Sequence, residues 1–347
     1  MLRGFIFLLH GIPYLYMGTY LRNSIIATIV YYDIFDYPLT SLEVYNFLVN
    51  PGRIAKITGG IGEISFKEIV EELDSLVKLN ILGEKNAFYS LAGREDLYAL
   101  RIKKQKIADQ KWKKFLKLTR FLSLAPYLRG VFASGSMALC NTDEESDFDV
   151  LVIAKSGRLY TCRLFLWLIS SLLMARRKKH EKVAPNKLCF NHYITDGDLF
   201  LNHKSLFNAQ AYINLKPVMV RPELIDKFFS SNLWLNNYAY NFKVQSNFVR
   251  RTVSRPLIFI VPAKMAEFIL NSSLGTWLEK FLRSHQQKII KNNPATYEPN
   301  GRIVFNKKEL EFHPRSFEKV VIDKYNRGLK RLGIIPYSWE IDSGLIH

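Results

Sequence analysis

The chain has 347 residues, which is enough for two or three domains with a sizeable core. Apolar residues make up 48% of it and aromatic residues 14%, a composition that excludes an intrinsically disordered protein. Lys and Arg outnumber Asp and Glu by 49 to 31, so the formal net charge is +18. This balance favours anionic partners such as nucleotides, nucleic acid or an acidic membrane surface.

The cysteines argue against two kinds of structural framework. Cys140, Cys162 and Cys189 are odd in number and far apart, and the sequence contains no CxxC pair or Cys/His cluster. Neither a zinc site nor a set of disulfides fits this spacing. The pattern favours a reducing cytoplasm.

Residues 1–23 form an apolar N-terminal extension. Its first sixteen residues resemble a signal peptide in composition, but they contain His10, Gly11 and Pro13, and no small-x-small cleavage site follows. Met17 is an alternative start, because ordinary amphipathic sequence begins just after it. We therefore expect a cytoplasmic protein without a membrane partner.

Residues 24–98 are predicted to form a winged-helix-like unit of three helices and a hairpin. The expected elements are a helix at 24–32, a helix opened by the capping box of Thr40 and Glu43, a helix at 65–79 and a hairpin at 81–91. Such units often bind DNA. The third helix, however, carries two lysines against four acids, a net charge of −2, over residues 65–80. We expect a protein contact or a packing role instead of specific DNA binding.

A basic connecting helix is predicted over residues 99–125. Residues 101–120 contain nine Lys and Arg residues and a single acid, Asp109. Two interpretations stay open: a solvated helix face, or a surface that gathers a polyanion, since one strong sign over five turns exceeds what solubility needs.

The next domain is predicted over residues 126–215 as strands alternating with helices. Its expected elements are a strand at 128–133, a turn into a helix at 134–139, a strand at 147–154, a helix at 157–175 and a strand at 187–195. The helix at 157–175 is nearly long enough to span a bilayer, but Arg163 lies within it, which favours burial behind a sheet. Residues 216–347 are expected to form a helical C-terminal region, with short strands near 301–312.

Two carboxylates alternate on the second strand of this domain. Asp147 and Asp149 share one face, while Phe148 and Val150 share the other with Val152. The apolar side chains fix that face against a core and leave both acids at an open surface. Adjacent carboxylates repel each other unless a cation lies between them, and oxygen ligands suit Mg²⁺.

A glycine and a serine follow the first strand. Gly135 permits a tight turn and a close approach of phosphate to the backbone. The helix that starts there offers free N–H groups to an anion, and Ser136 adds a hydroxyl donor. We therefore predict phosphate binding at Gly135 and Ser136, with Lys155 after the second strand as a further phosphate contact.

The combined pattern is Gly-Ser at 135–136, ten intervening residues, and Asp-Phe-Asp-Val at 147–150. It resembles the signature of the DNA polymerase β-type nucleotidyltransferase superfamily. The wider stretch from Gly135 to Val152 resembles the bacterial nucleotidyltransferase-domain proteins of that superfamily. The resemblance covers about 126–215, and residues 33–40 also resemble the N-terminal helical unit of some members.

The resemblance implies an α+β fold in which a small mixed-sheet nucleotidyltransferase core is flanked by the winged-helix-like unit and the helical C-terminal region. It also implies that Gly135 and Ser136 hold the phosphates of a nucleoside triphosphate (NTP). Asp147 and Asp149 would then ligate one or two Mg²⁺ ions. The reaction would be in-line attack on the α-phosphorus by a hydroxyl of a small molecule or protein, with release of pyrophosphate.

The sequence departs from the family pattern at the third acid. On the predicted strand 187–195, Asn191 stands where this acid is expected, on a face shared with Cys189 and Tyr193, and His192 falls on the core face. An amide can coordinate a metal but cannot accept a proton as a base. Asp196 and Asp198 follow the strand and are possible substitutes. The alternatives to an enzyme are thus a catalytically weak or inactive nucleotide-binding sensor or scaffold and, third, a DNA-binding regulator.

Overall fold

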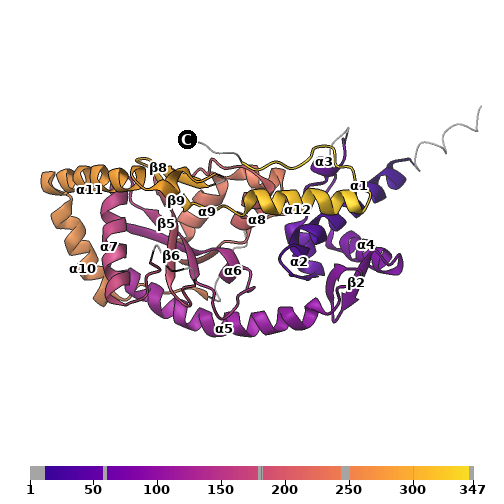
Figure 1. Cartoon of the computed structure of the whole chain (residues 1–347), viewed down its shortest axis with the longest axis horizontal. Coiled ribbons are helices and arrows are strands. Elements are labelled where there is room, and N and C mark those ends of the chain that lie inside the picture. The colour runs from indigo at the N-terminus through magenta and orange to yellow at the C-terminus, as the bar shows by residue number, and fades with distance from the viewer. Residues whose placement is uncertain are drawn as a thin grey trace, which may run out of the picture.

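The structure is a computed structural model that describes residues 12–57, 61–178, 181, 183–243, 251–299 and 301–343. The protein is a mixed α+β chain with two sheets (Figure 1). Of the predicted extension at 1–23, residues 1–11 lie outside this description. Helix α1 (Ile12–Asp33) begins well before residue 24, so the helix predicted at 24–32 is only its second half.

The N-terminal unit combines short helices with a three-stranded sheet. After α1 its elements are β1 (Leu39–Thr40), α2 (Ser41–Phe47), α3 (Pro51–Ile54), α4 (Phe66–Lys78), β2 (Leu82–Lys85) and β3 (Phe88–Leu91), and the sheet order is β1-β3-β2. The predicted capping box is present, because Thr40 and Glu43 exchange both hydrogen bonds at the start of α2. Ser65 and Glu68 form a second one before α4. Both helices therefore start where their local sequence dictates.

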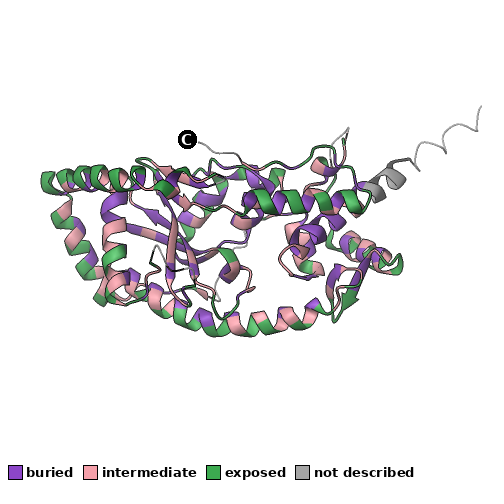
Figure 2. Ribbon diagram, in the orientation of Figure 1, coloured by how far each residue is buried: buried purple, intermediate pink, exposed green. Residues whose placement is uncertain are grey.

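The basic connecting helix is α5 (Leu97–Leu122), which runs along one side of the molecule from the N-terminal unit to the larger sheet (Figure 1). It buries Trp112 and Phe115 and exposes most of its lysines to solvent (Figure 2). Two of its basic residues, Arg101 and Lys111, are buried. Arg101 stacks on the ring of Tyr37 at 3.4 Å from the centroid.

The larger sheet has six strands in the order β7-β4-β5-β6-β9-β8. The strands are β4 (Leu128–Ala133), β5 (Phe148–Ala154), β6 (Leu188–Thr195), β7 (Lys216–Val220), β8 (Arg302–Phe305) and β9 (Glu309–His313). Only β5 and β6 pair in parallel. Strands β7, β8 and β9 come from beyond residue 215, so the sheet crosses the predicted boundary between core and C-terminal region.

Helices cover both faces of this sheet. One face packs against α5, α7 (Leu159–Leu172) and α11 (Ser273–Lys291). The other packs against α8 (Leu206–Ile213), α9 (Pro222–Ser230) and the short helix η1 (Leu233–Asn237). Even-numbered residues of β5 from Phe148 onward lie in the first core and Leu151 and Ile153 in the second, as the predicted alternation requires. The sheet is thus buried on both sides.

The last helices lie apart: α10 is at one end of the molecule, and α12 lies beside the N-terminal unit (Figure 1). Helix α10 (Leu257–Leu270) and α11 form an elbow beside α7, and the helix pair bends by 94°. Helix α12 (Glu318–Arg331) instead packs on α1 of the N-terminal unit. Gly328 permits this approach, because a Cβ atom there would lie 2.6 Å from Cγ1 of Val30.

Candidate functional site

The acid pair, Asp147 and Asp149, lies at the start of β5. Phe148 between them is fully buried, so the two carboxylates project from the other face of the strand and keep partial exposure. The backbone N–H of Ser134 donates to the carbonyl oxygen of Asp149 at 2.9 Å. This bond ties the end of β4 to the acid pair, because Ser134 immediately precedes the short helix α6 (Gly135–Ala138).

A side chain at position 135 would collide with Asp149, so the turn requires glycine there. Its φ is +59°, a left-handed conformation that favours glycine. A Cβ atom added there would lie 2.5 Å from Oδ2 of Asp149. Gly135 and Ser136 are accessible, the first exposed and the second half-buried. One predicted phosphate-binding residue, Gly135, and one predicted metal ligand, Asp149, are therefore in contact.

The loop between α6 and β5 is held from two sides. On one side, Lys111 of α5 donates through Nζ to the carbonyl oxygens of Glu144 and Ser146, each at 2.7 Å. Burial lowers the pKa of Lys111, but its two carbonyl acceptors and the nearby Asp147 favour the charged form. Part of the basic helix thus serves to position the strand that carries the acid pair.

On the other side, the N-terminal unit contacts the end of α6. The hydroxyl of Tyr37 donates to the carbonyl oxygen of Leu139 at 2.8 Å. The side-chain amide of Asn141 donates to the carbonyl oxygen of Phe35 at 3.0 Å. The segment at 33–38, noted in the sequence for its resemblance, therefore lies against the candidate site.

Three neighbouring side chains form hydrogen bonds with the acid pair. Arg177, which follows α7, donates to Oδ2 of Asp147 at 2.5 Å. Asn191 on β6 donates through Nδ2 to Oδ1 of Asp149 at 2.8 Å. Cys189 is hydrogen-bonded to Asp149 as well, and one ligand atom from each of Asp147, Asp149 and Cys189 lies within 4.8 Å of the others.

Asp149 is the carboxylate of the pair whose surroundings favour its protonated form. Burial raises the pKa of Asp149 to about 7, the negative charge of Asp147 adds to this effect, and Cys189 and Arg177 oppose it. Burial and the two carboxylates also raise the pKa of the Cys189 thiol, which keeps it protonated. A protonated thiol is a poor ligand for a hard cation, so Mg²⁺ would depend on the two carboxylates. A cation would also relieve the repulsion that holds a proton on Asp149.

Three residues considered from the sequence lie at the other end of the sheet. Lys155 follows the last residue of β5, six residues beyond Asp149, which corresponds to roughly 20 Å along a strand. Asp196 accepts a hydrogen bond from the backbone of Ser156 at 2.8 Å. Asp198 pairs with Lys308 at 3.0 Å. The structure therefore brings neither the lysine nor a substitute third acid to the acid pair, because parallel strands carry their following residues to the far edge.

Strand β6 also departs from the predicted alternation. Asp149 pairs with Cys189 and Leu151 with His192, so β6 contains one extra residue, a bulge. As a result Asn191 reaches Asp149 as predicted, but Tyr193 turns to the core that includes Phe148. His192 is buried as predicted.

Two further contributors carried no sequence signal. Arg177 lies in a run of four basic residues that is typical of a solvated helix end, and Lys111 is one of nine basic residues on its helix. Only the fold distinguishes them from their neighbours, because the partners of both are distant in sequence.

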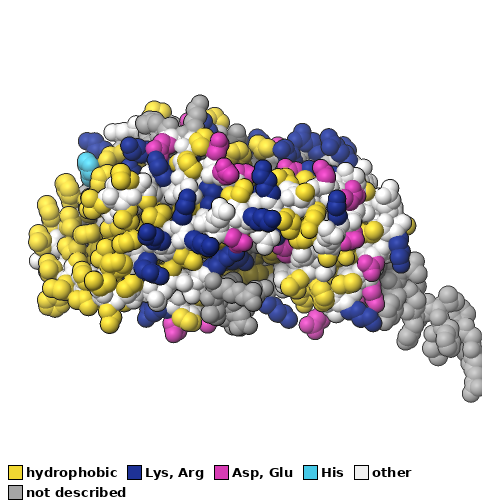
Figure 3. All heavy atoms as spheres, turned by 90° about the horizontal axis from the view of Figure 1, so that it is seen from below, with side chains coloured by type: hydrophobic (Ala, Val, Ile, Leu, Met, Phe, Trp, Pro, Cys, Tyr) yellow, Lys and Arg dark blue, Asp and Glu magenta, His cyan; other side chains and the backbone are white. Residues whose placement is uncertain are grey.

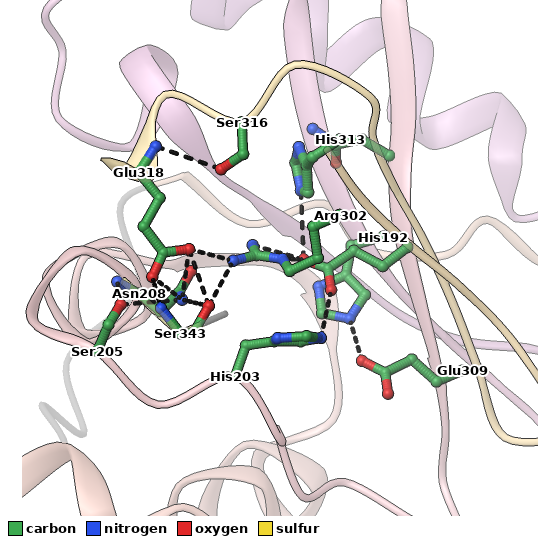
Figure 4. A network of polar contacts seen from close by, with 12 residues as sticks. His192, His203, Ser205, Asn208, Arg302, Glu309, His313, Ser316, Glu318 and Ser343 are labelled. Atoms are coloured by element: carbon green, nitrogen blue, oxygen red, sulfur yellow. Dashed lines mark hydrogen bonds and ion pairs between the residues drawn. The ribbon is translucent and has the colours of Figure 1, made fainter. Parts of the chain in front are cut away.

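A second charged group, the buried cluster, joins β6, β8, β9 and α12 (Figure 4). It consists of His192, Arg302, Glu309, Glu311 and Glu318, all less than 9% exposed. Arg302 pairs with Glu311 and Glu318, each at 2.7 Å. His192 lies 3.0 Å from Glu309.

The ionisation of Glu311 is favoured in spite of its burial. Burial opposes its charge, but His192, Arg302, His313 and His203 outweigh burial and lower the pKa of Glu311 to about 2. A guanidinium already occupies the centre of this cluster, so we assign it to structure and not to the candidate site.

Comparison with family models, curated proteins and solved structures finds no match to this chain.

Proposed function

We propose that this protein is a Mg²⁺-dependent nucleotidyltransferase that moves a nucleoside monophosphate from an NTP to a hydroxyl group of a small molecule or protein. One observation carries the proposal: the carboxylate of Asp149 fills the space where Gly135 lacks a side chain. Metal ligands and an open glycine-serine turn are thus adjacent, as they must be if a metal is to bridge phosphate oxygens.

In this arrangement each residue has a limited task. Asp147 and Asp149 would hold the metal, and Gly135 and Ser136 would lie against the phosphates. Arg177 donates to Asp147 and holds the orientation of that carboxylate. The metal, when bound, would polarise the α-phosphate and stabilise the leaving pyrophosphate.

The experiment is incubation of the protein with α-labelled NTPs, Mg²⁺ and a cell extract, followed by identification of the labelled product. Asp149→Ala should abolish both labelling and Mg²⁺-dependent NTP binding. Asp196→Ala is the matched control, because this acid is also half-buried but lies at the far end of the sheet. Unchanged NTP binding in the Asp149 variant, or equal loss in the Asp196 variant, would contradict the proposal.

The second candidate function is a nucleotide sensor or scaffold without turnover. It rests on Asn191, which donates to Asp149 from the place where a third carboxylate is expected. An amide cannot accept the proton of an attacking hydroxyl. The sensor hypothesis predicts tight Mg²⁺-dependent NTP binding and no transfer of label.

Asn191→Asp separates the two candidates. If the wild type is a sensor, a carboxylate at this position should strengthen Mg²⁺ binding and permit labelling that the wild type lacks. If the wild type is an enzyme that uses the amide, the added charge should alter its rate but not create a new activity. Asn191→Ala, which removes the contact to Asp149 without adding charge, controls for altered packing.

The N-terminal unit, which we propose is winged-helix-like, fits a packing role in either case. Helix α4 carries an excess of acids, and Arg22 of α1 pairs with Glu72 at 2.6 Å. The unit contacts the candidate site through the hydrogen bonds of Tyr37 and Asn141. A DNA-binding regulator remains the third choice, and salt-insensitive or absent affinity for duplex DNA would reject it.

A further inference from the structure

The elbow of α10 and α11 buries two carboxylates on its inner side, beside apolar residues such as Leu282 and Ile290 that pack into the core. On its inner side, Glu267 of α10 accepts from the backbone N–H of Tyr127 at 2.7 Å and pairs with Arg129 at 2.8 Å. Glu279 of α11 accepts from the backbone N–H groups of Tyr160 and Thr161. Carboxylates thus help to anchor the elbow to the protein, whereas a helix at a water-facing surface normally places its charged residues outward.

The outer side of the elbow is apolar. We call this surface the elbow face, and its nine side chains are each more than half exposed: Leu257, Ile258, Val261, Met265, Phe268, Ile269, Leu274, Trp277 and Phe281. Figure 3 shows hydrophobic side chains gathered over this end of the molecule. At roughly 100 Å² each, they present on the order of 900 Å², above the largest apolar patch of a typical monomer.

The charges around the elbow face have one sign. Over residues 257–291 the only acids are Glu267 and Glu279, and both are buried. Lys264, Lys280 and Lys288 are exposed in the same stretch. The exposed surface of the elbow therefore combines apolar side chains with cations and no anion.

The shape of the elbow is fixed by a close contact. The two helices bend by 94°, and a Cβ atom at Gly275 would lie 1.7 Å from the carbonyl oxygen of Leu270. Among the described residues no single helix is long and apolar enough to cross a membrane, and only this pair passes that test when its helices are taken together. The bend presents the elbow face as a convex surface at one end of the molecule.

We infer that the elbow face docks on the surface of an anionic lipid bilayer, with its apolar side chains inserted among the acyl chains and its lysines at the headgroups. Exposed Leu, Phe and Trp side chains beside lysines are the composition of helices that lie in a membrane interface, and Trp favours that boundary. A second copy of the chain would instead bring like charges together, because the net charge is +18. The inference departs from the sequence-based expectation of no membrane partner, and it does not depend on the acid pair.

The test is sedimentation of the full chain with lipid vesicles, made of phosphatidylcholine alone or mixed with phosphatidylglycerol. We expect binding to the mixed vesicles and at least tenfold weaker binding to the neutral ones. The double variant Phe268→Ser with Trp277→Ser should lose binding at least tenfold. Leu233→Ser with Ile335→Ser is the matched control, because these side chains are 71% and 82% exposed outside the elbow face.

Two further arms keep the test decisive. Lys280→Glu with Lys288→Glu should remove the preference for phosphatidylglycerol while the apolar side chains stay in place. If circular dichroism shows that the double Ser variant does not fold, the fluorescence of Trp277 in the unmodified chain is measured instead. Vesicles should shift the emission of the unmodified chain to the blue, and Trp277→Phe should remove most of that shift.

Three outcomes would overturn the inference. The first is equal binding by the elbow variants and the unmodified chain. Binding would then have to come from another segment, such as the apolar residues at 1–16, which are identical in both. The second is no binding to either kind of vesicle. The third is a dimer in sedimentation velocity that the Phe268 and Trp277 substitutions dissociate without any vesicle binding, because this would identify a second copy as the occupant.

Discussion

Two consecutive residues of β6 belong to different charged groups: Asn191 contacts the acid pair, and His192 is part of the buried cluster. The carboxylates of these two groups differ in ionisation. Asp149 has a pKa raised to about 7, while Glu311 has one lowered to about 2. Glu311 is the more deeply buried of the two, with no exposed surface. Burial alone therefore does not decide the charge of a carboxylate; the number of cationic partners does.

The difference separates a structural carboxylate from one that can receive a ligand. Arg302 donates directly to Glu311, whereas Arg177, whose charge opposes the rise in the pKa of Asp149, donates to Asp147. Among the described residues, the carboxylate of Asp149 accepts hydrogen bonds from the amide of Asn191 and the thiol of Cys189. A carboxylate with too few cationic partners is poised to accept an external cation.

The largest effect should come from breaking the buried cluster. Arg302→Met leaves Glu311 and Glu318 buried without their common partner, and we expect a loss of about 3–5 kcal/mol in the free energy of unfolding. Urea denaturation measures this loss. Arg315→Met is the control: its side chain is 82% exposed beside Glu298, so its loss should stay below about 1 kcal/mol. A loss for Arg302→Met as small as that of the control would contradict the assignment.

A smaller effect is expected at the glycine of the acid pair. Gly135→Ala forces a side chain into a left-handed backbone, at a cost of about 1–2 kcal/mol, and its Cβ atom collides with Asp149. We expect Mg²⁺-NTP affinity, measured by calorimetry, to fall at least about tenfold. Gly93→Ala is the matched control, because Gly93 has a φ of +82° and a Cβ atom there would meet no other atom within 4 Å. It should lose stability but retain affinity; similar affinities in the two variants would argue against the proposed contact.

The smallest effect is a pH dependence that only the acid pair should show. The folded pKa of Asp149, about 7, lies above its ordinary value of 3.8, so the metal-free fold prefers the protonated acid. Between pH 3.8 and about 7 the unfolded chain releases the proton of Asp149 while the folded chain keeps it, so stability falls as pH rises through this range. Mg²⁺, in contrast, must bind the ionised form. Its affinity should rise about tenfold from about pH 6 to pH 8. Titration calorimetry at both pH values measures this. Asp196→Asn, at the far end of the sheet, should leave the dependence unchanged, and a flat profile in the unmodified chain would refute it.

Local chemistry was predictable from the sequence. The capping box of Thr40 and Glu43, the hairpin after α4 and the alternation along β5 are each determined by residues a few positions apart. The closeness of Gly135 to Asp149 also follows from adjacent strands, because β4 and β5 pair directly.

Long-range features were not predictable in the same way. Strands β7, β8 and β9 join a sheet begun far earlier in the chain, and short strands carry little periodicity of their own. The bulge in β6 moves Tyr193 to the other face, and no residue type there announces it. Whether the apolar residues of α10 point inward or outward depends on the carboxylate anchors at Tyr127 and Arg129, which are about 140 residues away.

The packing of α12 on α1 has a consequence for how the chain matures on the ribosome. Val321, Ile322, Tyr325 and Leu329 of α12 are buried in the same core as α1. Helix α1 precedes α12 by most of the chain, so that core cannot be complete until α12 has also left the exit tunnel. Until then the apolar side chains of α1 that α12 covers are exposed on the nascent chain, so we expect its dependence on chaperones to persist until α12 emerges.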